Sequence, residues 1–168
     1  RLVSDWSSDV CSSDLLGTGA IEVKTTIATV GFPAIIESLD QLDDSTRQPL
    51  FLVAVRLRVD DNGTSLPEIV EQARTLIGND PARNTLDTKL LHAGYLDAAA
   101  HHYQRRFSAV ESRAIPVTGE FPRLTKATVA SGITGVRYEL DLDKVLAGTC
   151  IREALVQLGV LQETYGTY

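Results

Sequence analysis

The stretch LGTGAIEVKTT, residues 16–26, contains the strand pattern that is most informative about the fold. It also contains the two charged residues that are the strongest candidates for a functional site. Ile21 and Val23 alternate with Glu22 and Lys24, and such an alternation with a period of two is typical of a half-buried β-strand. Because Glu22 and Lys24 are two residues apart, both side chains leave the same face of a strand. This stretch therefore predicts a strand that presents a carboxylate and an ammonium group side by side.

The Glu22–Lys24 pair has two interpretations. A carboxylate, together with a second one from a neighbouring strand, can hold Mg²⁺ through oxygen ligands, and the metal lowers the pKa of a bound water. A lysine beside it can orient that water or offset the charge that develops on a phosphorane. The alternative is an ordinary surface ion pair, worth about 0–1 kcal/mol. The tripeptide alone does not decide between them.

Strands and helices alternate along the rest of the chain. The strongest further strand spans residues 49–59, and its apolar start suggests burial on both faces. Apolar residues at helical spacing, with Ser65 as the N-cap and Gly78 as the stop, predict a helix between these two residues. Further strands are expected at residues 34–36, 107–117 and 136–142, further helices at 81–93, 96–103 and 143–161, and a tight turn at 61–63. This order indicates an α/β fold with a mixed sheet flanked by helices.

A resemblance to a known family covers residues 16–168. The PD-(D/E)XK motif proteins, a restriction-endonuclease-like family, are similar to this chain in the ordered segments LGTGAIEVKTT, SLDQLDD, PLFLVAVRL, LPEIVEQAR, LLHAGYLD, FPRLT and GVRYELDL. The resemblance implies a nuclease core, a divalent cation (Mg²⁺ or Mn²⁺), a DNA substrate and a place in bacterial restriction or anti-phage defence. It also implies that Glu22 is a metal ligand and that Lys24 is the motif lysine that assists catalysis.

The beginning of the chain is expected not to be native. DWSSDVCSSDL, residues 5–15, matches the translation of a widely used short-read sequencing adapter without a gap. Residues 1–15 are therefore set aside, as a tag or fusion scar would be. The first motif aspartate of the family would fall within this stretch, and Asp14 is not expected to replace it. We expect residues 16–168 to be the C-terminal part of a single nuclease-like domain, incomplete at its N-terminus, that binds Mg²⁺ weakly and cleaves DNA little.

Five further residues are weaker candidates for the site. Gln41 could position a water or a phosphate, although a hydrogen bond within a loop is the alternative. Arg105 and Arg106 form one local basic patch, and Arg123 and Lys126 form another. Either patch could contact DNA phosphates, and the alternative is a solvated surface of mixed charge.

Composition limits the number of domains and the cellular compartments that are expected for this chain. The chain has 168 residues, 43% of them hydrophobic, which suits one soluble globular domain. No apolar run approaches the roughly 20 residues that span a bilayer, and no signal peptide is visible, so no membrane partner is expected. Cys11 and Cys150 do not make a disulfide framework, which favours the cytoplasm, and Cys150 is expected in the core or on a helix face.

Two classes of function remain. The net charge of −6 gives no general attraction for nucleic acid, so any DNA site must be a local patch. The first class is a metal-dependent DNA endonuclease of a bacterial defence system, with Glu22 and Lys24 in its site. The second is a non-catalytic subunit that kept the nuclease fold and binds DNA or another defence protein. The sequence does not fix the oligomeric state.

Overall fold

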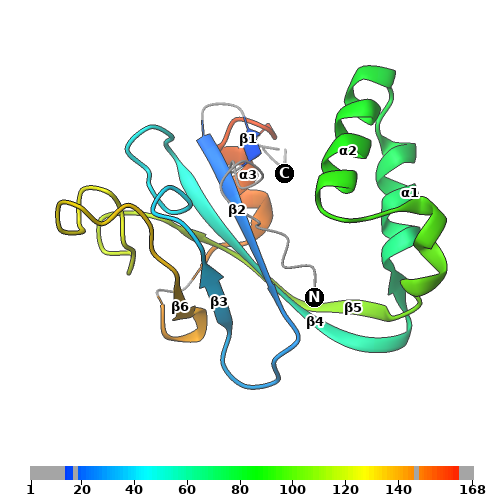
Figure 1. Ribbon diagram of the computed structural model, residues 1–168, viewed down its shortest axis with the longest axis horizontal. Helices are drawn as coiled ribbons and strands as arrows, with labels where there is room; N and C mark the ends of the chain where they lie inside the picture. The colour runs from blue at the N-terminus through cyan, green and yellow to red at the C-terminus, as the bar shows by residue number, and fades with distance from the viewer. Residues whose placement is uncertain (1–13, 17–18, 146–147, 163–168) are drawn as a thin grey trace, which may run out of the picture. The chain divides into compact units, whose positions relative to one another are not determined.

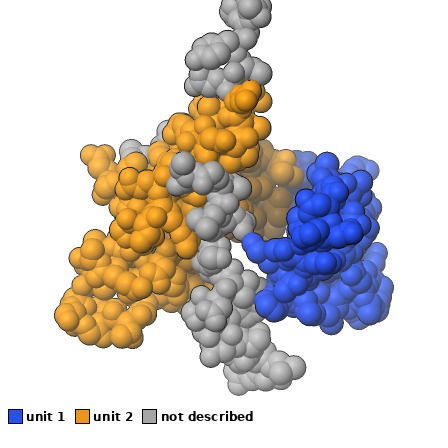
Figure 2. Space-filling model, turned by 90° about the horizontal axis from the view of Figure 1, so that it is seen from above, with its two compact units in different colours: residues 1–10, 58–108 blue, residues 11–57, 109–168 orange. Residues whose placement is uncertain are grey.

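The computed structural model describes residues 14–16, 19–145 and 148–162, with side chains from residue 19 onward. Residues 1–13, which hold most of the adapter-like stretch, lie outside the described residues. Two compact units are distinguished in Figure 2: among the described residues, unit 1 contains 58–108 and unit 2 contains the remainder.

The strands form one larger and one smaller sheet (Figure 1). In the larger sheet the order is β1-β2-β4-β5, β1 is antiparallel to β2, and β2 is parallel to β4, so the sheet is mixed. In the smaller sheet β3 is antiparallel to β6. The strands are β1 (Asp14–Leu16), β2 (Gly19–Thr26), β3 (Pro33–Ile36), β4 (Leu50–Ser65), β5 (Arg106–Pro116) and β6 (Tyr138–Asp141). The predicted α/β class with a mixed sheet is confirmed.

Each face of the larger sheet in unit 2 packs against different elements. On one face, Leu52 and Ala54 of β4 lie in a buried cluster with Ala34 and Ile36 of β3, so the smaller sheet covers this face. On the other face, a second buried cluster joins Phe51 and Val53 of β4 to Ala154 and Leu158, in and just after α3 (Ile151–Gln157). Burial on both faces is what the apolar run at the start of β4 predicted.

The predicted helix over residues 143–161 is wrong. A short 3₁₀ helix, η2 (Leu142–Lys144), comes first, and α3 begins only at Ile151. Between them, Thr149 exchanges two backbone hydrogen bonds with Ala114, at 2.9 and 2.7 Å. Gly148 allows this approach, because a Cβ there would lie 2.7 Å from the Ala114 carbonyl oxygen. Cys150 is exposed at the start of α3 rather than buried.

Unit 1 contains α1 (Leu66–Leu76), α2 (Asp80–His92) and the 3₁₀ helix η1 (Asp97–His102). The N-terminus of α1 lies where it was predicted, since the Ser65 backbone N–H donates to the Glu68 carboxylate at 2.8 Å. The expected turn at 61–63 is wrong, because β4 continues through it to Ser65. The apolar stripe of α1 is largely exposed: Val70 is its buried residue, while Leu76 is 85% exposed. Among the described residues, no helix has the length and apolar character needed to cross a bilayer.

Arg74 joins the three helices of unit 1. Its guanidinium forms ion pairs with Glu71 at 2.7 Å, Asp87 at 2.8 Å and Asp97 at 2.9 Å. The hydrogen bonds from Arg74 are the main reason why the pKa of Asp97 lies below its ordinary value. This arrangement fixes α1, α2 and η1 to one another within the unit.

Acid is expected to weaken unit 1 through Asp97. Because its pKa is lowered in the folded state, the carboxylate contributes stability above the ordinary aspartate pKa of about 3.9, and the contribution is lost as pH falls through the lower folded pKa. Urea unfolding between pH 7 and pH 2 should therefore show a smaller loss of stability on acidification for Asp97→Asn than for the wild type. An identical pH dependence for both proteins would contradict this role.

Candidate functional site

Glu22 and Lys24 lie in the middle of β2, as the sequence predicted, and form an ion pair. Lys24 Nζ is 2.9 Å from Glu22 Oε1, and the side chains are 16% and 9% exposed, respectively. In the parallel register, Glu22 is beside Leu52 and Lys24 is beside Ala54 on β4. Both side chains therefore share the sheet face that the smaller sheet covers.

The burial of the strand differs from what its alternation suggested. In a half-buried strand with this alternation, Ile21 and Val23 would face the core, but Val23 is 52% exposed and Glu22 is buried. Ile21 is only partly buried, against the cluster that includes α3. The face that carries Glu22 is covered by β3 and β6, and β6 begins more than 100 residues after β2, so the local pattern could not reveal which face would be covered.

The burial distinguishes this pair from an ordinary surface ion pair. Removing two charges from water carries a desolvation penalty that their attraction often only balances, so a buried pair is weak evidence of a stabilising role. Charged groups in apolar surroundings interact more strongly with other charges than they do in water. A buried carboxylate paired with a partly buried ammonium on one strand is thus better suited to chemistry than to holding the fold.

Gln41 is fully buried in the loop after β3. Its side-chain Oε1 accepts a hydrogen bond from the Glu37 backbone N–H at 2.8 Å. This bond is the loop role that the sequence offered as the alternative to a catalytic one. The geometry gives Gln41 a structural reason to be buried, whether or not it also takes part in chemistry.

The predicted basic patch in the FPRLTK segment is engaged with acidic residues of the loop between β3 and β4. Arg123 donates to the Leu42 carbonyl at 3.1 Å and pairs with Asp44 at 2.8 Å, and its side chain is only 14% exposed. Lys126 pairs with Asp40 at 2.8 Å but is 67% exposed. Arg123 therefore links the FPRLTK segment to the loop between β3 and β4. Lys126 is accessible to a phosphate, which would replace its exposed ion pair with Asp40.

Arg105 and Arg106 belong to unit 1, whereas Glu22 and Lys24 belong to unit 2. Arg106 donates to the Gly63 carbonyl at 2.8 Å and pairs with Glu68 at 2.9 Å, so it holds β5 to the end of β4. Arg105 is exposed. Of this predicted patch, Arg105 is the residue whose exposure suits a contact with phosphate.

A divalent cation needs more ligands than this site shows. Within the part of the chain that the structure describes, no group of three or more His, Cys, Asp or Glu residues is placed to hold a metal ion. Glu22 provides one oxygen donor of the kind that Mg²⁺ and Mn²⁺ prefer, which is not a complete ligand set. The described residues therefore do not fit a resident metal by themselves, and the chemistry that can be assigned to them is that of Glu22 and Lys24.

A cavity of about 590 Å³ opens at the beginning of β4, and sequence reasoning did not anticipate it. Its polar lining among the described residues includes Asp44, Gln48, Thr118 and Gln157. Glu22 and Lys24 are not part of this lining. The cavity and the buried pair are thus separate features of unit 2.

Comparison with protein families gives a match that covers most of the chain. The model of a family described as "Putative PD-(D/E)XK family member, (DUF4420)" matches residues 15–143. The matched region covers parts of both compact units and includes Glu22 and Lys24. No curated protein and no solved structure matches the chain.

Proposed function

Since this chain belongs to the DUF4420 family of PD-(D/E)XK proteins, we propose that it is a nuclease that hydrolyses phosphodiester bonds in DNA. The observation that carries the proposal is the buried ion pair of 2.9 Å between Glu22 and Lys24 on β2. These are the two residues of the chain that match the second half of the family motif, and their burial agrees with a functional role.

The two side chains suit different parts of the reaction. In hydrolysis, a water oxygen forms a bond to phosphorus while the bond from phosphorus to the leaving oxygen breaks, and negative charge grows on the remaining phosphate oxygens. The Lys24 ammonium would donate hydrogen bonds to one of these oxygens as its charge grows. The Glu22 carboxylate would accept a hydrogen bond from the attacking water and orient it.

We further propose Mg²⁺ or Mn²⁺ as the cofactor and bacterial restriction or anti-phage defence in the cytoplasm as the setting. These proposals rest on the family alone. Because the described residues do not complete a metal site, a second function has specific support: a non-catalytic subunit that binds DNA or another defence protein. Cleavage of DNA distinguishes the two.

Nicking of supercoiled plasmid tests the proposal. With Mg²⁺ or Mn²⁺, we expect slow conversion to the open-circular form that stops when EDTA is added. Glu22→Gln and Lys24→Ala should each lower the rate at least about 100-fold, as loss of a group that stabilises the transition state does. We expect a low rate in the wild type because the ligand set among the described residues is incomplete.

Two control variants make this measurement specific. Arg58 also pairs with a residue two positions away on its strand, Asp60 at 3.2 Å, but its side chain is 66% exposed. Glu139 is an exposed glutamate on β6. Arg58→Ala and Glu139→Gln should leave nicking unchanged. If Glu22→Gln and Lys24→Ala nick plasmid at the wild-type rate, these two residues are not the site of the reaction. If the wild type binds plasmid but does not nick it, the result supports the non-catalytic binding subunit.

A further inference from the structure

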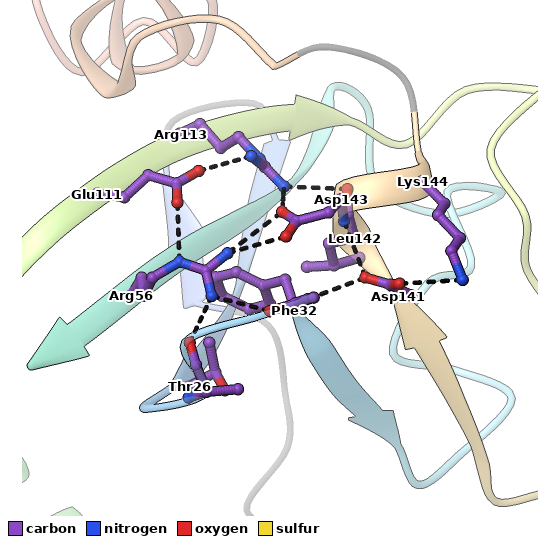
Figure 3. A network of polar contacts seen from close by, with 11 residues as sticks. Thr26, Phe32, Arg56, Glu111, Arg113, Asp141, Leu142, Asp143 and Lys144 are labelled. Atoms are coloured by element: carbon purple, nitrogen blue, oxygen red, sulfur yellow. Dashed lines mark hydrogen bonds and ion pairs between the residues drawn. The ribbon is translucent and has the colours of Figure 1, made fainter.

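A closed ring of alternating charges lies in unit 2, on β4, β5 and η2 (Figure 3). Arg56 is 2.9 Å from Glu111 and 3.0 Å from Asp143. Arg113 is 2.6 Å from the same Glu111 and 2.8 Å from the same Asp143. Each arginine thus contacts both carboxylates, and each carboxylate contacts both arginines.

The ring is joined to the loop that follows β2. Arg56 Nη1 donates to the carbonyl oxygens of Ala28 at 2.6 Å and Gly31 at 2.8 Å. The Arg56 guanidinium also lies over the Phe32 ring, 5.2 Å from its centre. Asp141 holds the same loop from β6, because it accepts a hydrogen bond from the Phe32 backbone N–H at 2.9 Å (Figure 3). The loop between β2 and β3 is therefore fixed by both groups.

Arg56 of the ring also lies on the sheet face that carries the Glu22–Lys24 pair. Lys24 is beside Ala54 in the register and Thr26 is beside Arg56, so Arg56 is two positions further along the face that carries the pair. By the same register, Arg56 is four positions beyond Leu52, the neighbour of Glu22, so it can act on the pair through β2 and the loop after it rather than by contact with Glu22. The two carboxylates of the ring and the two loop carbonyls occupy its guanidinium.

We propose that the ring formed by Arg56, Glu111, Arg113 and Asp143 is a positioning unit for the candidate active site. It fixes the loop that follows β2 and thereby the C-terminal end of that strand, so that Lys24, two residues before the end, stays beside Glu22. The catalytic part of this inference rests on the proposed nuclease function, whereas the effect on the Glu22–Lys24 pair does not. Stability alone does not account for the ring well, because Glu111 and Asp143 are each 36% exposed and ion pairs with exposed carboxylates contribute little.

The NMR signal of the Lys24 ammonium group can show directly whether Lys24 is paired with Glu22. The lysines of the chain are Lys24, Lys89, Lys126 and Lys144. In a ¹H–¹⁵N spectrum of lysine-labelled protein, the ammonium of Lys24 should be visible because its pairing and burial slow proton exchange with water. Lys24→Arg identifies the signal by removing it.

Two ring variants should change that signal. Arg56→Lys keeps the charge but cannot make the forked contacts of a guanidinium, and Asp143→Asn removes one carboxylate with little change of shape. We expect the Lys24 signal to be lost or clearly shifted in both. The control is Arg74→Lys, because Arg74 has a similar set of carboxylate partners in unit 1 and its side chain is 18% exposed, against 15% for Arg56. Arg74→Lys should leave the Lys24 signal in place.

Plasmid nicking separates this inference from the proposed function. If the wild type nicks DNA, Arg56→Lys should lower the single-turnover rate and leave the Kd for DNA unchanged, while Arg74→Lys changes neither. If the wild type does not nick DNA, the proposed function fails, but the Lys24 signal still decides whether the ring positions the pair. An unchanged Lys24 signal in folded Arg56→Lys and Asp143→Asn proteins would overturn the inference.

Discussion

Replacing Phe32 by alanine is expected to lower the free energy of unfolding by about 3–5 kcal/mol, the usual cost of truncating a buried aromatic residue. The side chain of Phe32 is fully buried in the core cluster between the larger and smaller sheets. The guanidinium groups of Arg56 and Arg113 lie over its ring at 5.2 and 5.9 Å from the centre. The substitution therefore leaves a cavity beneath two charged groups, and urea unfolding measures the loss.

Val30→Ala is the matched control for Phe32→Ala. Val30 lies in the same loop but is 89% exposed, so its truncation should change the free energy of unfolding by no more than about 0.5 kcal/mol. A cost below about 1 kcal/mol for Phe32→Ala would show that the loop does not pack as the structure has it.

Removing one member of the Glu22–Lys24 pair should cost far more stability than removing both. Lys24→Met or Glu22→Leu alone removes one partner and leaves the other charge on a largely covered face, and breaking a buried pair in this way typically costs about 3–5 kcal/mol. The double variant Glu22→Leu/Lys24→Met replaces the pair by apolar side chains on a face already lined by Leu52 and Ala54. We expect it to be as stable as the wild type or more stable, as such replacements often are.

Urea unfolding of the wild type, both single variants and the double variant forms a double-mutant cycle that measures the coupling between Glu22 and Lys24. A double variant whose destabilisation equals the sum of the two single variants would mean that the pair contributes no coupling energy. That result would contradict the interpretation of Glu22 and Lys24 as a strongly interacting ion pair.

Much of the fold could be predicted from local patterns. The alternation around Glu22 placed β2, the apolar run in PLFLVAVRL placed β4, and Ser65 placed the start of α1. These signals are local because backbone periodicity and capping depend on neighbouring residues. The period of two also placed Glu22 and Lys24 on one face, which is the part of the site that sequence could supply.

The features that sequence missed depend on contacts between distant segments. Glu22 is buried because β3 and β6 cover its face, and β6 begins only at Tyr138. The helix expected over residues 143–161 is interrupted where Gly148 and Thr149 approach Ala114. Arg56 pairs with a carboxylate 87 residues away, which no pattern of neighbouring residues indicates. An arginine inside an apolar strand was the available signal, because such a residue requires partners.

The nicking rate of the double variant Glu22→Leu/Lys24→Met tests the central claim most directly, because this protein is expected to be folded. The measurement compares its conversion of supercoiled plasmid with that of the wild type in Mn²⁺, at a temperature where circular dichroism shows both to be folded. We expect wild-type nicking to be slow but dependent on the divalent cation, and nicking by the double variant to be at least about 100-fold slower. Nicking by the double variant at the wild-type rate would contradict the assignment of Glu22 and Lys24 as the site of the reaction.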